Sequence, residues 1–298
     1  MNTLNKYGYT PISMDGFAPI LENINTQVPT LMTKENLLKC FSYMDLTTLS
    51  TDDTPTKVKA LVEKTNNFSA QFPNYPLPAS ICVYSNLANA VKTSRLSEEL
   101  AITVVSACFP TSQSFLEVKL LECELAVKEG AEEIDIVLAL NSFCEGNYEV
   151  AKNEILQIRN HIDAAASKYS KNNVVLKVIL ETGLLVDSEK IAQASFLAME
   201  AGADFIKTST GKVSVNATPE AFWTMCECVK TYHQATGKKV GVKAAGGIST
   251  SEDAIKYFAI IKEVLGEEWL SPSLFRLGVS RLANSIVSSI EGRDCKFF

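Results

Sequence analysis

The stretch ADFIKTSTGK, residues 203–212, places a lysine inside a short run that otherwise has the composition of a buried β-strand. Side chains on a strand point alternately to opposite faces, so Lys207 would share a face with Phe205 and Ser209. An ammonium group is costly to bury unless a partner compensates its charge. The fold must therefore supply partners for Lys207.

Seven other apolar runs accompany this one, and segments with helical spacing separate them. The eight runs cover residues 42–49, 80–85, 101–109, 132–140, 174–182, 204–210, 239–247 and 274–280. Between two of them, Ile155, Ile158 and Ile162 are spaced to share one helix face. Eight strand and helix units in some 250 residues predict a (β/α)₈ TIM barrel, an α/β fold of parallel strands joined by helices.

Helix start signals agree with this alternation. Thr218 before Pro219 predicts an N-cap with proline at the first helical position, and Ser249 with Glu252 predicts a capping box. The competing fold is a doubly wound sheet, but no G-x-G-x-x-G follows an early strand. The STGK sequence ending at Lys212 also lacks the first glycine and the final Ser/Thr of a phosphate-binding P-loop.

Charged residues recur on the predicted strands at positions that oppose apolar neighbours. Asp135, Lys177, Lys207 and Lys243 alternate with Ile, Leu or Val residues that would pack against the outer helices. We therefore expect these four side chains to point into the barrel, and Asp45 on the first strand to join them. A single buried lysine could extend its ammonium group to solvent at a strand end, but four charges on successive strands favour a functional cluster.

Such a cluster has a chemical use. A lysine with a pKa near 10.4 is almost fully protonated at pH 7, so its amine is a poor nucleophile. Burial and a neighbouring cation both lower a lysine pKa, which is how Schiff-base lysines are activated. Three lysines with one or two aspartates supply this surplus of positive charge, and Asp135 is the natural carboxylate for proton transfer. From the residues alone, Lys207 and Lys243 are equal candidates for the nucleophile.

Composition limits the classes of partner. The 298 residues carry a formal net charge of -6, which argues against a nucleic-acid partner and favours a small molecule. No apolar run is long enough for a membrane span, and neither a metal nor a cofactor is expected. His161 and His233 fall outside the charged cluster. The eight cysteines, with no CxxC pair and no signal-peptide pattern, predict reduced thiols in the cytoplasm.

Several segments together resemble the deoxyribose-phosphate aldolase family of class I aldolases. They are MDLTTL (44–49), ICVY (81–84), EEIDIV (132–137), LKVILETG (176–183), GADFIKTSTGKVSVNATPE (202–220), VGVKAAGGI (240–248) and LFRLGVS (274–280). The resemblance extends from about residue 38 to about residue 290. It implies a TIM barrel that reversibly cleaves 2-deoxy-D-ribose 5-phosphate into D-glyceraldehyde 3-phosphate and acetaldehyde, in deoxyribonucleotide catabolism.

The resemblance also implies roles for individual residues. Lys207 would form the Schiff base, Lys243 would lower its pKa and share proton transfer, and Asp135 would donate and accept protons. Lys177 and Asp45 are added to this catalytic set because strand alternation, and not the resemblance, places them in the same cluster. The family's barrel is often a homodimer or homotetramer, and its substrate is a phosphosugar.

A phosphate site is expected in the loops after the last strands, where glycines expose backbone N–H groups to an anion. The candidates are Gly211, Lys212, Gly246, Gly247, Gly278, Ser280 and Arg281. Family members often have arginine where this chain has Ser249 and proline where it has Ala244. Arg281 replaces a usual small residue, so we expect it to substitute for the missing arginine.

Two alternative functions and a division of the chain complete the predictions. Another Schiff-base barrel aldolase would share the chemistry without the FIKTSTGK context. A noncatalytic relative that binds phosphosugars or acts as a scaffold would be expected to lose a catalytic lysine, and this chain has lost none. We predict an N-terminal extension over residues 1–33, the barrel over 34–292 and a C-terminal tail over 293–298.

Overall fold

The computed structural model describes residues 3–298 and has eight parallel strands closed into a barrel in sequence order. The strands are β1 (Met44–Thr47), β2 (Ser80–Tyr84), β3 (Ala101–Val105), β4 (Glu133–Val137), β5 (Val175–Ile179), β6 (Phe205–Lys207), β7 (Gly241–Ala245) and β8 (Phe275–Val279). Each lies within one of the eight predicted runs. The predicted TIM barrel is confirmed, with strands shorter than the apolar runs because the ends of those runs form the connecting loops.

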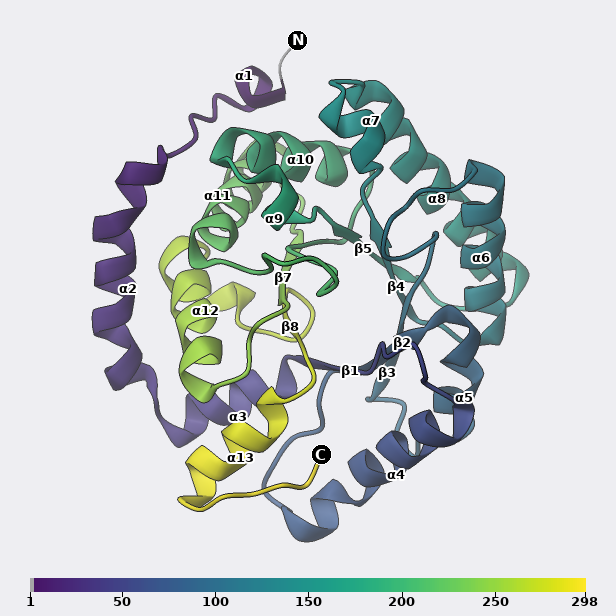
Figure 1. Ribbon diagram of the computed structural model, residues 1–298, viewed down its shortest axis with the longest axis vertical. Helices are drawn as coiled ribbons and strands as arrows, with labels where there is room; N and C mark the ends of the chain where they lie inside the picture. Colours follow the sequence, from purple (N-terminus) through teal and green to yellow (C-terminus); the bar gives the residue numbers. More distant parts are fainter. Residues whose placement is uncertain (1–2) are drawn as a thin grey trace.

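Helices surround this barrel, with additional short helices at several of its loops (Figure 1). The α-helices are α1 (Thr3–Tyr7), α2 (Phe17–Leu31), α3 (Lys34–Ser42), α4 (Pro55–Gln71), α5 (Ala88–Lys92), α6 (Leu116–Glu129), α7 (Leu140–Cys144), α8 (Tyr148–Lys168), α9 (Thr182–Leu185), α10 (Ser188–Glu200), α11 (Pro219–Thr236), α12 (Ser251–Val264) and α13 (Leu282–Glu291). Short 3₁₀ helices are η1 (Met14–Gly16), η2 (Ser85–Leu87) and η3 (Glu267–Trp269).

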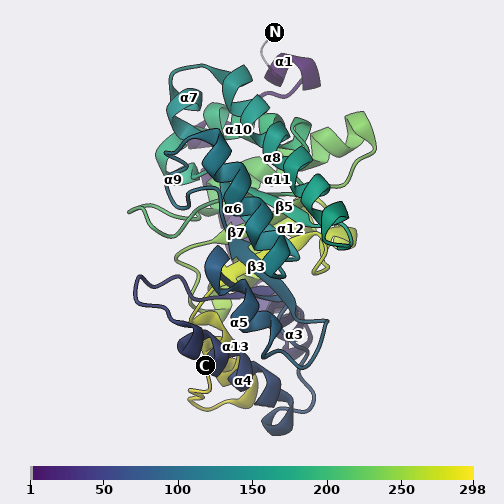
Figure 2. The ribbon, with the colours of Figure 1, turned by 90° about the vertical axis from the view of Figure 1, so that its right-hand side faces the viewer.

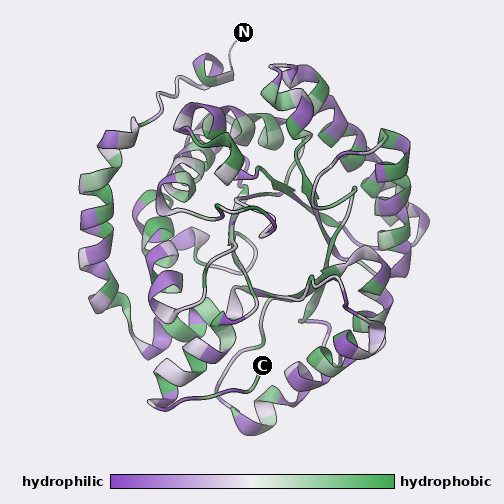
Figure 3. Cartoon of the chain, viewed as in Figure 1, coloured by the Kyte–Doolittle hydropathy of each residue, from purple (hydrophilic) through white to green (hydrophobic). Residues whose placement is uncertain are grey.

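The main apolar core lies between the strands and the outer helices. Outward-facing strand residues such as Ile134, Leu176 and Ile206 are fully buried there. In Figure 3 the outer helices alternate between hydrophobic and hydrophilic residues, as expected of helices with one face on a sheet and one in solvent. This arrangement leaves the inward-facing strand residues free to carry charge.

The helix caps explain where two of the predicted helices begin. Thr218 caps α11 by accepting a hydrogen bond from the Ala221 N–H, and Pro219 follows it as predicted. The capping box of α12 is formed by Thr250 and Asp253, so the predicted pair, Ser249 and Glu252, was wrong by one residue. Both pairs have suitable side chains, and the backbone makes its turn one residue later than the sequence pattern indicated.

The two ends of the described chain pack on different sides of the barrel (Figures 1 and 2). Helix α2 lies outside α11 and α12, and Tyr7 stacks on Phe196 of α10 with ring centroids 4.6 Å apart. At the other end, Phe298 packs beside Phe68 of α4, and Asn284 binds the tail backbone. The tail therefore lies against helices on the outside of the barrel. The division at residues 33 and 292 stays a prediction.

Candidate active site

The strand register brings the predicted charged residues together inside the barrel. Lys207 on β6 is paired in register with Lys243 on β7, and Lys243 is in turn paired with Arg276 on β8. On the other side, Asp135 on β4 pairs with Lys177 on β5. Since neighbouring positions in register point to the same face of the sheet, all five side chains face inward.

Asp135 is the centre of this cluster. Its Oδ2 atom accepts hydrogen bonds from Nζ of Lys207 at 2.7 Å and from Nζ of Lys243 at 2.8 Å. Its Oδ1 atom accepts a hydrogen bond from Nζ of Lys177 at 3.0 Å. A single carboxylate thus contacts all three predicted lysines, and one of its oxygens bridges Lys207 and Lys243.

A second layer below Asp135 contains two residues that we did not predict from the sequence, Glu133 and Arg276. Arg276 donates hydrogen bonds to Asp45 at 2.5 Å and to Glu133 at 2.7 Å. Glu133 also accepts a hydrogen bond from Lys177 at 2.5 Å, and Asp45 forms an ion pair with Lys243. Asp45 therefore joins the cluster through both layers.

We call these seven residues the charged floor: Asp45, Glu133, Asp135, Lys177, Lys207, Lys243 and Arg276. Four cations and three carboxylates leave one surplus positive charge. Two neighbouring hydroxyls add hydrogen bonds to the floor: that of Ser80 donates to Asp45 at 2.8 Å and that of Thr103 donates to Glu133 at 2.7 Å. The expected excess of positive charge is therefore kept although the network is larger than predicted.

The pKa values in the floor differ in direction because the lysines differ in their partners. Burial lowers the pKa of Lys207 below its usual value, the Lys243 ammonium lowers it further, and Asp135 opposes both effects. Burial also acts to lower the pKa of Lys243, but Asp135 and Asp45 outweigh it and raise that pKa. Burial acts to raise the pKa of Asp135, but the three lysines hold it well below its ordinary range. Lys207 is therefore the one lysine of the floor whose pKa is lowered, while the pKa values of Lys177 and Lys243 are raised.

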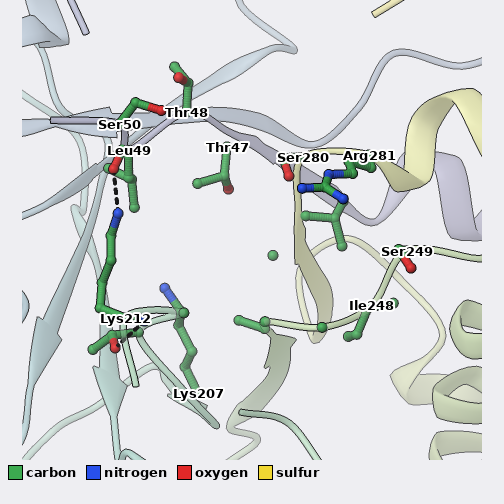
Figure 4. A pocket seen from close by; sticks show the side chains of 17 residues that line it. Thr47, Thr48, Leu49, Ser50, Lys207, Lys212, Ile248, Ser249, Ser280 and Arg281 are labelled. Carbon is green, nitrogen blue, oxygen red and sulfur yellow. Dashed lines mark hydrogen bonds between the residues drawn. The ribbon is translucent and has the colours of Figure 1, made fainter. Parts of the chain in front are cut away.

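A cavity of about 540 Å³ opens above Lys207 at the carboxyl ends of the strands. It is lined by all seven predicted phosphate-site residues, which we call the anion rim: Gly211, Lys212, Gly246, Gly247, Gly278, Ser280 and Arg281. Figure 4 shows Lys207 pointing into the pocket, with Lys212 on one side and Ser280 and Arg281 on the other. The volume suits a small-molecule ligand.

Backbone geometry explains two of the rim glycines. Gly246 has φ of 84°, a left-handed conformation, and a Cβ atom there would lie 2.7 Å from the side chain of Asn216. A Cβ atom at Gly278 would lie 3.0 Å from Cε of Lys243 and 2.9 Å from Cβ of Ala245. A larger residue is therefore disfavoured at Gly246 by both the backbone conformation and the contact with Asn216. At Gly278 it is disfavoured by the contacts with Ala245 and Lys243.

The end of β1 and the loop after it form a part of the cavity wall that we did not predict. Thr47, Thr48, Leu49 and Ser50 all line the cavity, and the backbone carbonyl of Leu49 accepts a hydrogen bond from Nζ of Lys212 at 2.5 Å. No spacing in this segment indicates a ligand, because ordinary turn residues follow the strand. Its place in the site follows from closure of the barrel.

The two histidines, which were not expected in the site, lie away from the cavity. His161 contacts Glu124 on the outer helices, and His233 packs against Trp269. Within residues 3–298, no group of three His, Cys, Asp or Glu residues is placed to hold a metal ion, and no helix is long and apolar enough to cross a membrane. All eight cysteines are unpaired.

Comparison with known proteins assigns this arrangement to a family. The model of the DeoC/LacD family aldolases matches residues 39–260. The deoxyribose-phosphate aldolases of Homo sapiens and Bos taurus are 37% and 36% identical over 272 residues, which cover 85% of this chain and 80% of each relative. A solved structure, the tetrameric deoxyribose phosphate aldolase of Aeropyrum pernix, matches with a TM-score of 0.66 and 26% identity, covering 91% of this chain and 97% of that one. The chain therefore belongs to the DeoC/LacD aldolase family and is a carbon–carbon lyase built on a TIM barrel.

Proposed function

We propose that this chain is a class I aldolase that reversibly cleaves 2-deoxy-D-ribose 5-phosphate into D-glyceraldehyde 3-phosphate and acetaldehyde. The observation that carries the proposal is the environment of Lys207, which is buried, lines the cavity and has a lowered pKa. Its ammonium group donates a hydrogen bond to Asp135, and Lys243 is its partner in register on the neighbouring strand. Family membership and the names of the relatives support the same substrate.

Lys207 acts as the nucleophile. Its neutral amine attacks the aldehyde carbon of the open-chain sugar to give a carbinolamine, which loses water to form a protonated Schiff base. The cationic nitrogen then accepts the electron pair of the breaking carbon–carbon bond as the sugar hydroxyl loses its proton. D-glyceraldehyde 3-phosphate leaves, and the remaining enamine takes up a proton. Water then releases acetaldehyde and restores the amine.

Asp135 and Lys243 move the protons in these steps. Oδ2 of Asp135 lies within hydrogen-bond distance of both ammonium groups, so one oxygen can pass a proton between the reacting nitrogen and Lys243. Lys243 also keeps a positive charge beside Lys207, which favours the neutral nucleophile. Lys177 forms an ion pair with Asp135, and Asp45 forms one with Lys243, so both proton-transfer groups are fixed in position.

The anion rim binds the 5-phosphate. Gly246 and Gly247 leave their backbone exposed at the cavity, and Lys212 and Arg281 add two cations at its edges. Arg281 is exposed and lies beside Ser280 in Figure 4, where its guanidinium can reach a phosphate above the pocket. Arg281 thereby supplies the phosphate-binding guanidinium that family members often have at the position of Ser249.

Borohydride trapping tests the proposal directly. Reduction in the presence of acetaldehyde should leave an N-ethyl group on Lys207, found by peptide mapping, and the Lys207→Met variant should lose it. Asp135 retains Lys177 and Lys243 as partners in that variant, so we expect it to fold. A folded wild-type protein without an adduct at Lys207 would contradict the proposal.

Three further features belong to this proposal, each with its own support. A homodimer or homotetramer is supported by the tetrameric Aeropyrum pernix structure. A cytoplasmic location is supported by eight unpaired cysteines, which suit a reducing compartment. A role in deoxyribose phosphate catabolism is supported by the proposed substrate.

A further inference from the structure

The segment after β5 is held in an unusual backbone conformation. Helix α9 lies between Glu181, with φ of 56°, and Val186, with φ of 65°. Positive φ is uncommon for residues other than glycine and is especially so for a β-branched valine. Such conformations persist only where the surroundings fix them, and they concentrate at functional sites.

Glu181 has an unusual set of partners. Its side chain is only 2% exposed, and its two oxygens accept hydrogen bonds from the N–H of Thr210 at 3.1 Å and from the hydroxyl of Thr210 at 2.6 Å. Within the described residues, no lysine, arginine or histidine lies within ion-pair distance of it. A buried carboxylate without a cation is costly, so a well-packed apolar residue would serve stability alone as well or better.

The contacts of Thr210 lead to the anion rim. The Thr210 hydroxyl accepts a hydrogen bond from the N–H of Lys212 at 3.0 Å while it donates to Glu181. Thr210, Gly211 and Lys212 all line the cavity above Lys207. Glu181 therefore fixes, through one hydroxyl, the backbone that carries Lys212 into the cavity.

Helix α9 also supports the far part of the same loop. A Cβ atom at Gly183 would lie 2.0 Å from the backbone oxygen of Val215, so the helix and the loop are in direct contact there. The N–H of Thr182 donates to the backbone oxygen of Thr208 at 2.9 Å. The loop over residues 208–215 is therefore held by three successive residues of the β5–α9 connection.

We propose that Glu181 is a positioning residue that preorganises this loop for the phosphate group of the substrate. It touches neither the reacting carbonyl nor the charged floor, so it acts on phosphate recognition and leaves the chemistry at Lys207 unchanged. The inference rests on the proposed phosphate site.

Glutamine at this position is the sharpest test, because it keeps the shape and removes one acceptor. The amide nitrogen of the glutamine would face either the Thr210 N–H or the Thr210 hydroxyl. In the first case two N–H donors would face each other, and the hydrogen bond to the Thr210 N–H would be lost. In the second case the hydroxyl would receive two donors, and its own proton would lose its partner. Either outcome loosens the link between Glu181 and Lys212.

The experiment compares 2-deoxyribose 5-phosphate with unphosphorylated 2-deoxyribose. For Glu181→Gln we expect about a tenfold rise in KM for the phosphorylated sugar, with its kcat and the kcat/KM for 2-deoxyribose within about twofold of wild type. Gly183→Ala and Thr210→Val should shift the same KM in the same direction. Glu189→Gln, an exposed acid of α10, is the matched control and should change neither substrate.

The outcomes separate the inference from the proposed function. Equal losses with both sugars in Glu181→Gln, with wild-type circular dichroism and an intact acetaldehyde adduct on Lys207, would overturn the positioning role. If Glu181→Gln does not fold, an unchanged KM in both Gly183→Ala and Thr210→Val would overturn it instead. A wild-type enzyme that shows no preference for the phosphorylated sugar would overturn the phosphate site itself, and this inference with it.

Discussion

The charged floor and the anion rim meet in one cavity but differ in almost every physical property. The floor is built from strand residues that are buried and form hydrogen bonds with one another at 2.5–3.1 Å. The rim is built mainly from loop residues, with Gly278 near the end of β8, and its Ser280 and Arg281 are exposed. A rigid floor fixes pKa values and proton paths, whereas an open rim leaves donors free for an anion.

This difference separates the two kinds of effect that substitutions should have. Changes in the floor should alter the rate of the chemical steps for any aldehyde substrate. Changes in the rim should alter binding of the phosphorylated sugar and leave the unphosphorylated one nearly unaffected.

Asp135→Asn should have the largest effect. The amide cannot take up a proton from either lysine, so we expect kcat to fall by about 10²- to 10⁴-fold with both phosphorylated and unphosphorylated sugar. Three buried ammonium groups would also lose their shared carboxylate, which should cost about 3 kcal/mol or more of folding stability. Steady-state kinetics and thermal unfolding measure the two effects. A folded variant whose kcat stays within tenfold of wild type would contradict the role of Asp135.

Lys243→Met should move the pH dependence of kcat/KM. The neutral amine of Lys207 is the reactive form, so activity rises with pH through the pKa of that lysine. Burial and the Lys243 charge both lower this pKa, so removing the charge should raise it and shift the acidic limb to higher pH. Lys239→Met, an exposed lysine paired with Glu268, is the control. An unmoved or downward-shifted limb would show that Lys243 does not tune Lys207.

Arg281→Ala should have the smallest effect and be confined to the rim. Loss of one charge-assisted contact should raise KM for 2-deoxyribose 5-phosphate by about five- to tenfold, while kcat/KM for 2-deoxyribose stays within about twofold. The exposed Arg293→Ala serves as the control. Equal changes with the two sugars would remove Arg281 from the phosphate site.

The sequence predicted the barrel and much of the floor because strand alternation is a local property. Asp135, Lys177, Lys207 and Lys243 each interrupt an apolar run at a position that must face inward. Glu133 did not stand out, since it follows Glu132 at a strand start and two adjacent acids are typical of an exposed loop. Arg276 pairs with Asp45 only because β8 closes against β1, a contact that no local pattern reports.

The rim was predicted by residue type and position after a strand, but its support was not. Glu181 and Gly183 belong to the connection after β5, and their partners Thr210 and Val215 lie about thirty residues away. Residues with positive φ, such as Val186, follow no composition signal. Family resemblance supplied the choice of Lys207 over Lys243, and the directions of the two pKa shifts agree with that choice.

Gly278 joins the two regions, and this limits how the enzyme can be diversified. The residue lines the cavity as part of the rim, yet the space beside its Cα is occupied by the hydrocarbon chain of Lys243. A library that randomises the rim to change substrate preference would displace this lysine with nearly every residue it introduced at 278. Selection for new substrates should therefore return glycine at this position, while Ser280 and Arg281 are free to vary.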